Sequence, residues 1–487
     1  MSRIFNIALV QNIGFNAVAK VIAIVLSGVA NVVLAWHLGS RDYGIAGFAL
    51  IIINLFSQFN DFGINNAVIQ RKELKDRSLY TGFTMKVILG LLVFAASFLI
   101  APLAKYIFSE TAVVNVIKLL SLNFLVNSLS FIPVTILTRE LNFKTMMLYQ
   151  IAAPLVSAVT SIVLAVNGFT YWSIVIGNVC ATLASVILIN ILKPVKVKIE
   201  FDRRDAREFV NYGAKMFYSQ LLVFAIINLD NFLVGTVAGA EALGYYALAF
   251  NWGSLISVLS ASVILTVLFP TFAKIQHDRT IIKDTYLRVM KVIAFIIIMV
   301  NLCLFSVSRE FLVLILGHGT DKWLPSMLVL KIFCVYGIGR ALLEPVGSVV
   351  LAIGRTDLLL KSTLITAFIE TAFLYPALRY YGIPGVAIVV TMSYMLQYFI
   401  YFPALRNEIN LDFREMIRAV RPAIVSGLLL GVAMALFMRW YGENQPTAAL
   451  FTLKLVICTC GYIFMHGLFS KWTMFKEARI ILATMKA

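Results

Sequence analysis

The chain has 487 residues, of which 61% are apolar and only 13% are charged, whereas a soluble domain is about 45–50% apolar and about 25% charged. A soluble fold of this size could not cover itself with polar groups, so the composition excludes one and indicates that the surplus apolar surface faces lipid. The formal net charge is +17. The basic residues lie in short loops between apolar segments, which indicates a membrane surface and no nucleic-acid partner.

Fourteen apolar segments, taken in chain order, are long enough to cross the hydrocarbon core, which is about 30 Å thick and takes about 20 helical residues. We therefore predict an all-α polytopic membrane protein with about fourteen transmembrane helices. The first segment continues to about Leu38 without a small-residue cleavage site, so we expect a retained helix and not a signal peptide. The spans lie near residues 10–37, 44–70, 80–101, 113–137, 148–167, 170–192, 214–237, 244–273, 289–307, 324–352, 358–379, 384–405, 421–439 and 448–470.

The basic residues are distributed unequally between the two sides of the membrane. Of the 41 Lys and Arg residues, 28 fall at the termini, in the loops on the side of the termini or at the adjoining span ends, and 6 fall in the opposite loops or at their span ends. Short cytoplasmic loops carry the excess of Lys and Arg in membrane proteins. We therefore predict that both termini face the cytoplasm.

The most basic loop, 193–212, divides the chain into blocks of six spans. We predict an N-terminal six-helix lobe at 1–192, a cytoplasmic basic linker at 193–212, and a C-terminal six-helix lobe at 213–406. Residues 407–487 then hold two extra helices and a cytoplasmic tail. Because six spans return the chain to its starting side, such lobes would be related by an axis along the membrane normal.

A shift of 200 residues gives modest support for this repeat. It aligns Gly39 with Gly239 and Gly44 with Gly244, at the outer turns of the first and seventh spans. Glycine permits a tight turn between helices, so we interpret the shared spacing as one turn used twice. The alternative is a pair of unrelated short turns.

The sequence offers no site for enzyme chemistry or for a cofactor. It has no Gly-rich phosphate loop with a following Lys and Ser or Thr, its outer loops are short, and its five Cys and four His lack metal-ligand spacing. We predict a transporter and not an enzyme, driven by its substrate or by an ion gradient of H⁺ or Na⁺.

Ionisable residues inside a span are expensive, so they mark cavities or pair with partners. Lys20 lies about ten residues into the first span, with no acid on the neighbouring turns, and is our first candidate for binding an anionic substrate; a pair with an acid on another helix is the alternative. Arg340 and Glu344 are four residues apart on one helix face and can pair. We expect Arg340 to line the cavity if its face turns inward, and Glu344 to be a gate or structural charge.

Three acids complete the candidates. Asp230, beside Asn228 and Asn231, could bind a cation, a proton or sugar hydroxyls, or belong to an outer polar cluster. Glu370 lies near mid-span and could be a counter-ion. Asp61 lies at the cytoplasmic end of the second span, where helix capping or a gate would explain it. The lysines near span ends are expected to extend to the interface and receive no site role: Lys86, Lys118, Lys215, Lys331 and Lys454.

Several phrases resemble the polysaccharide-export branch of the multidrug/oligosaccharidyl-lipid/polysaccharide (MOP) flippase superfamily, closest to the colanic-acid and O-antigen-unit exporters. The phrase FNDFGINNAVIQRKE is fairly specific to that branch, whereas LG-x3-YG recurs across the superfamily. The resemblance covers most of the first twelve spans. Its phrases lie at 38–44, 59–73, 137–143, 243–251, 268–278 and 344–357.

The resemblance implies two six-helix lobes around a central cavity in a bacterial inner membrane. It implies alternating access that carries an undecaprenyl-pyrophosphate-linked oligosaccharide from the cytoplasmic to the periplasmic leaflet, for exopolysaccharide, capsule or O-antigen (lipopolysaccharide) synthesis. Cationic residues of the first helices contact the pyrophosphate in the wider group, a role that Lys20 fits.

Two other functions stay open at this point. An ion-coupled multidrug or cation antiporter of the same superfamily would use acids such as Asp230 or Glu370. A non-transporting scaffold would recruit a polysaccharide polymerase or another assembly protein through loop 193–212.

Overall fold

The computed structural model describes residues 2–71, 73–108, 110–441 and 446–470, with side chains from Val18 onward except for parts of 260–274, Thr356 and residues 440–441. Within these residues every regular element is a helix, which confirms the all-α prediction. The chain forms two compact units, Met1–Ala247 and Leu248–Ala487.

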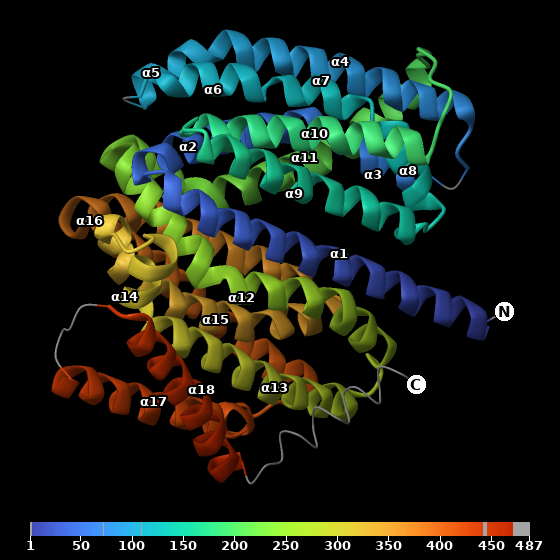
Figure 1. The fold of residues 1–487 in the computed structure, drawn as a ribbon. Helices are drawn as coiled ribbons and strands as arrows, with labels where there is room; N and C mark the ends of the chain where they lie inside the picture. The colour runs from blue at the N-terminus through green and yellow to red at the C-terminus, as the bar shows by residue number, and fades with distance from the viewer. Residues whose placement is uncertain (1, 72, 109, 442–445, 471–487) are drawn as a thin grey trace. The chain divides into compact units, whose positions relative to one another are not determined.

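The first unit is built from a set of long and short helices (Figure 1). They are α1 (Ser2–His37), α2 (Ser40–Asp61), α3 (Ile64–Gln70), α4 (Asp76–Ile100), η1 (Ala101–Leu103), α5 (Ala104–Ile107), α6 (Ala112–Leu120), α7 (Leu122–Ser128), α8 (Phe131–Arg139), α9 (Phe143–Val166), α10 (Trp172–Leu192), α11 (Arg203–Leu233) and the π-helical turn η2 (Val234–Ala238). Helix α9 packs along both α1 and α10, and α4 packs on α7. The separation of α9 from α10 matches the predicted split between the fifth and sixth spans.

Helix α12 (Gly239–Lys274) begins in the first unit and continues into the second. The second unit continues with α13 (Arg279–Ser306), α14 (Ser308–Glu310), η3 (Phe311–Leu316), η4 (Asp321–Ser326), α15 (Met327–Ala352), α16 (Thr356–Ile409), α17 (Phe413–Tyr441) and α18 (Ala448–Ser470). Helix α13 packs on α15, α17 and α18, so it forms the centre of this unit. Its apolar core includes Tyr286, Val349 and Tyr462, all fully buried.

Two predicted spans are broken in the structure. The second span bends between α2 and α3, where Phe62 and Gly63 take left-handed backbone conformations. The fourth span, expected as one helix over 113–137, consists of α6, α7 and α8, with a bend of 52° before Phe131. Apolar composition predicts that a segment lies in the membrane but says nothing about such bends.

Eleven described helices are long and apolar enough to cross a membrane, or twelve if the bent fourth span is included. Two of these segments, Arg203–Leu259 and Asp357–Ile409, have 57 and 53 residues, so at about 1.5 Å per residue each is more than twice the hydrocarbon thickness. Each is therefore long enough for two spans, and the second turns at Gly382, whose φ of 63° suits glycine. The count of fourteen and the cytoplasmic position of the termini stay predictions.

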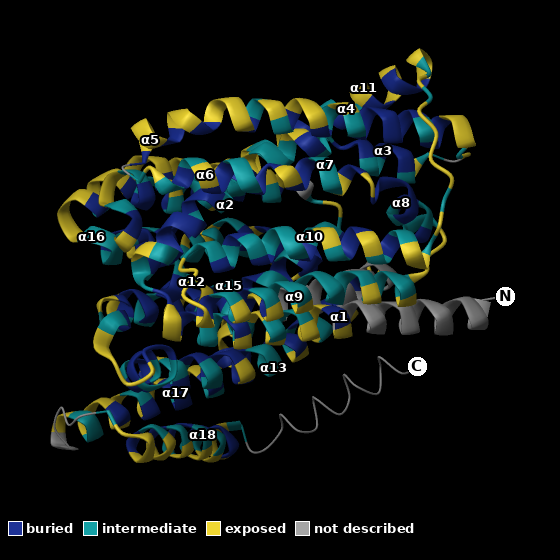
Figure 2. Cartoon of the chain, turned by 45° about the horizontal axis from the view of Figure 1, so that its top comes forward, coloured by how far each residue is buried: buried dark blue, intermediate teal, exposed yellow. Residues whose placement is uncertain are grey.

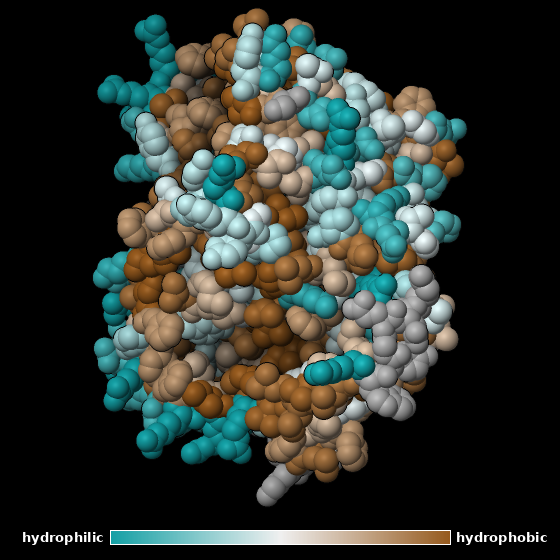
Figure 3. Space-filling model, turned by 90° about the vertical axis from the view of Figure 1, so that its left-hand side faces the viewer, coloured by the Kyte–Doolittle hydropathy of each residue, from teal (hydrophilic) through white to brown (hydrophobic). Residues whose placement is uncertain are grey.

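The helices expose many large apolar side chains, as a lipid-facing surface requires. Figure 2 shows exposed residues along the outer helices. Leu99 is 75% exposed, Phe368 73% and Phe399 77%. Figure 3 shows apolar side chains reaching the molecular surface between hydrophilic ones on one face. The protein is therefore a multi-pass membrane protein.

The two units are defined by packing, and their boundary lies at a different place in the chain from the boundary between the predicted lobes. Packing places α11, and with it the linker 193–212, in the first unit, and the division falls inside α12. The predicted lobes group spans by sequence repeat rather than by packing, and their boundaries stay a prediction.

Candidate functional site

Lys20 is exposed on α1, although its neighbour Ala19 is fully buried. It lies 17 residues before His37, where α1 ends, which corresponds to about 25 Å along the helix. In a core about 30 Å thick, this depth is inside the hydrocarbon but beyond its middle, towards the N-terminal end of the helix. No described side chain forms an ion pair with Lys20. The expected alternative, a pair with an acid on another helix, is therefore not seen among the described side chains.

Arg340 lies beside a pair of tyrosine rings in the second unit. Its guanidinium carbon is 6.0 Å from the ring centre of Tyr336 and 5.9 Å from that of Tyr394, and Nη1 donates to the Tyr336 hydroxyl at 3.2 Å. The predicted pair with Glu344 is present, with a separation of 3.7 Å. Both side chains keep over a fifth of their surface exposed. The cation is thus oriented by aromatic faces while it remains accessible to a ligand.

The two tyrosines were not identified from the sequence. Tyr394, Tyr398 and Tyr401 follow one another at spacings of four and three residues, which places them on one face of α16. The Tyr398 hydroxyl donates to the Gly339 carbonyl at 2.9 Å and thereby joins this face to α15. An aromatic stripe is also the usual pattern of a packed core, so the spacing alone would not have indicated a cation site.

Glu370 belongs to a ladder of polar contacts between the two halves of α16. Ser393 donates to Glu370 at 2.8 Å. One turn away Gln397 donates to Thr366 at 3.0 Å, and one turn further the hydroxyls of Ser362 and Tyr401 are 2.5 Å apart. The steps of four residues on each half keep all three contacts on one seam. Glu370 is 4% exposed, so its carboxylate lies inside a helix hairpin.

Asp230 is also buried, in the first unit. The Tyr246 hydroxyl donates to its Oδ2 at 2.7 Å, and both the backbone and the side-chain nitrogen of Asn231 donate to Oδ1, at 2.7 and 3.0 Å. Both carboxylate oxygens therefore have partners, which corresponds to the predicted polar cluster. A role of Asp230 in binding substrate stays a prediction.

Asp61 contacts Lys86, a lysine that we expected to extend to the membrane interface. Lys86 is buried and lies 3.4 Å from Asp61, and it donates to the Asn60 carbonyl at 2.9 Å. Asp61 also accepts from the Asn65 side chain at 2.9 Å. The expectation that Lys86 extends to the interface was wrong, because a carboxylate and a carbonyl compensate its burial.

Lys454 is the second lysine wrongly expected at the interface. It forms an ion pair with Glu310, and only 5% and 2% of the two side chains are exposed. This pair joins α18 to α14, so it attaches the C-terminal helices to the rest of the second unit. Its partners are 144 residues apart in sequence, and no local pattern could have indicated it.

The linker 193–212 is partly attached to the start of α4. Arg71 and Ser78 donate to Asp205 at 2.8 and 2.6 Å, and Thr84 donates to the Glu200 carbonyl at 2.8 Å. The Asp205 carboxylate raises the pKa of Arg71 through its hydrogen bond. Asp202 caps α11, and the backbone N–H groups of Asp205 and Arg204 lower its pKa. The end of the linker is therefore packed structure, whereas Lys196 and Lys198 are exposed.

The two aligned glycine turns contact each other. A Cβ added at Gly44 would overlap the backbone of Ala240, and one added at Gly244 would overlap the backbone of Ser40. These two contacts are exchanged by the shift of 200 residues that aligns the turns, because residue 40 corresponds to 240 and 44 to 244. The reciprocal contact supports the interpretation of one turn used twice. Only glycine allows the two helix starts to approach this closely.

The candidates do not form one cluster within either unit. Lys20, Asp61 and Asp230 lie in separate surroundings in the first unit. In the second unit, Arg340 and Glu344 are in contact, and Glu370 belongs to the polar ladder. Among the candidates predicted from the sequence, Lys20, which is exposed, and Arg340, which lies beside two tyrosine rings, are the cations with the geometry to meet an anionic ligand.

Comparison with known proteins identifies relatives across most of the chain. Residues 33–328 match the family described as polysaccharide biosynthesis protein. The lipopolysaccharide biosynthesis protein WzxC of Escherichia coli (strain K12) is 27% identical over 438 residues, which cover 86% of this chain and 87% of WzxC.

Two solved structures have the same fold. The lipid II flippase MurJ, in an inward closed conformation, superposes with a TM-score of 0.76 at 16% identity, over 94% of this chain and 98% of MurJ. An inward-facing multidrug resistance MATE transporter of the MOP superfamily superposes with a TM-score of 0.64 at 16% identity, over 80% of this chain and 94% of the transporter. The fold is therefore that of the MOP transporters. The family match spans well over half of the sequence, and the chain belongs to the polysaccharide biosynthesis protein family.

Proposed function

We propose that this protein is a flippase that moves lipid-linked oligosaccharides across the membrane. One observation carries the proposal: a member of the polysaccharide biosynthesis family has, over 94% of its length, the fold of the lipid II flippase MurJ. It acts as a transporter and not as an enzyme. We propose that its substrate is an undecaprenyl-pyrophosphate-linked repeat unit, which alternating access moves from the cytoplasmic to the periplasmic leaflet of the bacterial inner membrane.

Two cations, the exposed Lys20 and the partly buried Arg340, suit the phosphates of such a substrate. Lys20 is exposed at hydrocarbon depth, where an uncompensated charge is costly, so a pyrophosphate would find there a cation without a competing acid among the described side chains. Arg340 is oriented by Tyr336 and Tyr394, and its Nη1 and Nε already face Tyr336 and Glu344, so a phosphate or a sugar hydroxyl would meet the guanidinium mainly at Nη2. We assign phosphate binding to Lys20 and a supporting role to Arg340.

The main alternative is an ion-coupled multidrug or cation antiporter, which the MATE likeness favours. Such an antiporter needs acids that exchange protons or Na⁺ for a cation. Asp230 and Glu370 are both buried and accept hydrogen bonds from hydroxyl groups, in Tyr246 and Ser393. These bonds explain both acids as structural polar contacts, so the geometry favours the flippase.

The scaffold alternative would use the linker to recruit a polymerase or another assembly protein. The contacts of Glu200, Asp202 and Asp205 with α4 give the end of the linker a structural role. Only the part near Lys196 and Lys198 offers an exposed basic surface to a partner. The packing of the linker therefore supports a scaffold function less well than it supports transport.

Reconstitution tests the proposed function. The purified chain is placed in liposomes with a fluorescent undecaprenyl-pyrophosphate oligosaccharide, and an impermeant glycosidase reports how much of the glycan is on the outer leaflet. We expect the accessible fraction to rise in proteoliposomes and to stay constant in liposomes without protein. No exchange of any tested glycan, together with drug-driven H⁺ or Na⁺ movement, would replace the flippase by the antiporter.

A further inference from the structure

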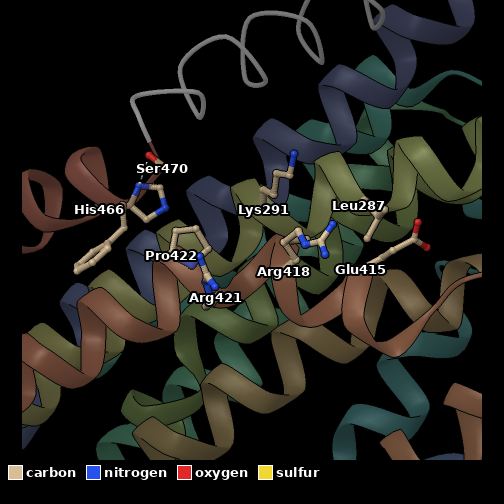
Figure 4. Close-up of a pocket in the computed structure, with 10 residues that line it drawn as sticks. Leu287, Lys291, Glu415, Arg418, Arg421, Pro422, His466 and Ser470 are labelled. Atoms are coloured by element: carbon tan, nitrogen blue, oxygen red, sulfur yellow. Dashed lines mark hydrogen bonds between the residues drawn. The ribbon is translucent and has the colours of Figure 1, made fainter.

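A basic pocket lies at one end of the second unit, between α13, α17 and α18. Its volume is about 420 Å³, within the range of about 300–1,000 Å³ that is typical of small-molecule sites. Figure 4 shows Lys291 from α13, Arg418 and Arg421 from α17, and His466 and Ser470 from α18 around it. The lining residues of each helix are mostly three or four apart, so one face of each helix contributes one or two turns to the pocket.

The lining is cationic and its one acid is already neutralised. Glu415 lies 3.2 Å from Lys283. Arg418 and Arg421 are exposed and form no ion pair with an acid among the described residues. Two arginines and one lysine that converge on a pocket are the donors expected for a phosphate group, since the guanidinium matches two phosphate oxygens at once.

An apolar stripe continues directly from this pocket. Ile417, Arg421, Ile424 and Leu428 are all exposed on α17, at spacings of four, three and four residues, so Arg421 lies in line with three apolar side chains. Leu468 is likewise exposed near the end of α18. A soluble anion would make no contact with such a stripe, whereas the acyl chains of a lipid would cover it.

We propose that this basic pocket binds the phosphate headgroup of an anionic glycerophospholipid of the surrounding bilayer, with the acyl chains along α17. The pocket lies at the end of these helices that is predicted to face the cytoplasm, where basic pockets between transmembrane helices bind anionic headgroups. The site is independent of what the protein transports. The lipid would bridge α13, α17 and α18 and so hold the C-terminal helices against the second unit.

Lipid binding by the purified full chain tests the proposal. Binding of phosphatidylglycerol is measured by native mass spectrometry in a mild detergent, with phosphatidylcholine as the neutral lipid. We expect Arg418→Ala/Arg421→Ala to weaken phosphatidylglycerol binding about thirtyfold, from about 1 kcal/mol for each basic residue. Arg406→Ala/Arg414→Ala is the matched control, because it removes the same charge from exposed arginines of the same region outside the pocket. It should bind as the wild type does.

Three outcomes would overturn the proposal. The first is equal phosphatidylglycerol binding by the pocket variant and the control. The second is displacement of the lipid by millimolar inorganic phosphate, which would make the pocket a free-anion site. The third is preferential displacement by undecaprenyl phosphate, which would assign the pocket to the transported lipid. Arg418→Lys/Arg421→Lys keeps the charges but not the paired hydrogen bonds, so it should bind more weakly than the wild type and more tightly than Arg418→Ala/Arg421→Ala.

Discussion

Lys20 on α1 and Lys454 on α18 lie in similarly apolar stretches of sequence, yet their surroundings in the structure are opposite. Lys454 is 5% exposed and ion-paired with Glu310, whereas Lys20 is exposed and has no ion pair among the described side chains. A buried pair compensates the desolvation of its charges within the protein, while an exposed cation at hydrocarbon depth leaves its charge available to a ligand. The depth of a charge in the membrane therefore does not indicate its role; the partner does.

The strongest test of this contrast is to remove one member of the buried pair. Lys454→Ala removes the ion-pair partner of the buried Glu310, and breaking a buried pair in this way typically costs about 3–5 kcal/mol of stability. We expect the free energy of unfolding in detergent to fall by about this amount, whereas Lys20→Ala should change it by less than about 0.5 kcal/mol, as for an ordinary exposed position.

A matched double variant sharpens this result. Lys454→Met/Glu310→Gln removes both charges and should recover most of the stability that the single variant loses, because neither partner is left buried and charged. If Lys454→Ala proves as harmless as Lys20→Ala, the two lysines do not differ in the way we describe.

The helices were predictable from the sequence to a greater extent than the contacts between them. Runs of apolar residues located the spans, including the separate helices α9 and α10, because hydrophobic length is a local property. The 52° bend before Phe131 and the pairing of Lys454 with Glu310 depend on packing between distant segments. Lys20 and Arg340 were identified as candidate cations, but the tyrosines that orient Arg340 were missed because aromatic stripes are common in cores.

The close backbone contact at Gly44 provides a second comparison, with the open position Gly47. Gly44→Val would force a side chain into the Ala240 backbone, and overpacking of this kind costs about 1–3 kcal/mol. Gly47→Val is the control, since a Cβ there meets nothing within 4 Å. Thermal unfolding in detergent should distinguish the two variants. Equal melting temperatures would show that the reciprocal glycine contact is not close in solution.

The smallest effect is expected for the buried acids. Asp230→Asn and Glu370→Gln keep an oxygen that can accept a hydrogen bond, so each should lower the free energy of unfolding by about 1 kcal/mol and leave glycan transport intact. Transport is measured in the proteoliposome assay at two pH values. Loss of glycan transport in either variant, without unfolding, would show that the acid takes part in transport and is not only a structural contact. This result would favour the antiporter.

The most direct test of the central contrast is leaflet exchange by Lys20 variants of the full chain in proteoliposomes. We predict that Lys20→Ala reduces the rate of exchange of the undecaprenyl-pyrophosphate oligosaccharide at least about tenfold, the equivalent of about 1.4 kcal/mol. Lys20→Arg should keep most of the activity, and Lys144→Ala, which removes an exposed lysine at the start of α9, should keep all of it. Exchange by Lys20→Ala at the wild-type rate would contradict the role of Lys20 as the phosphate-binding cation.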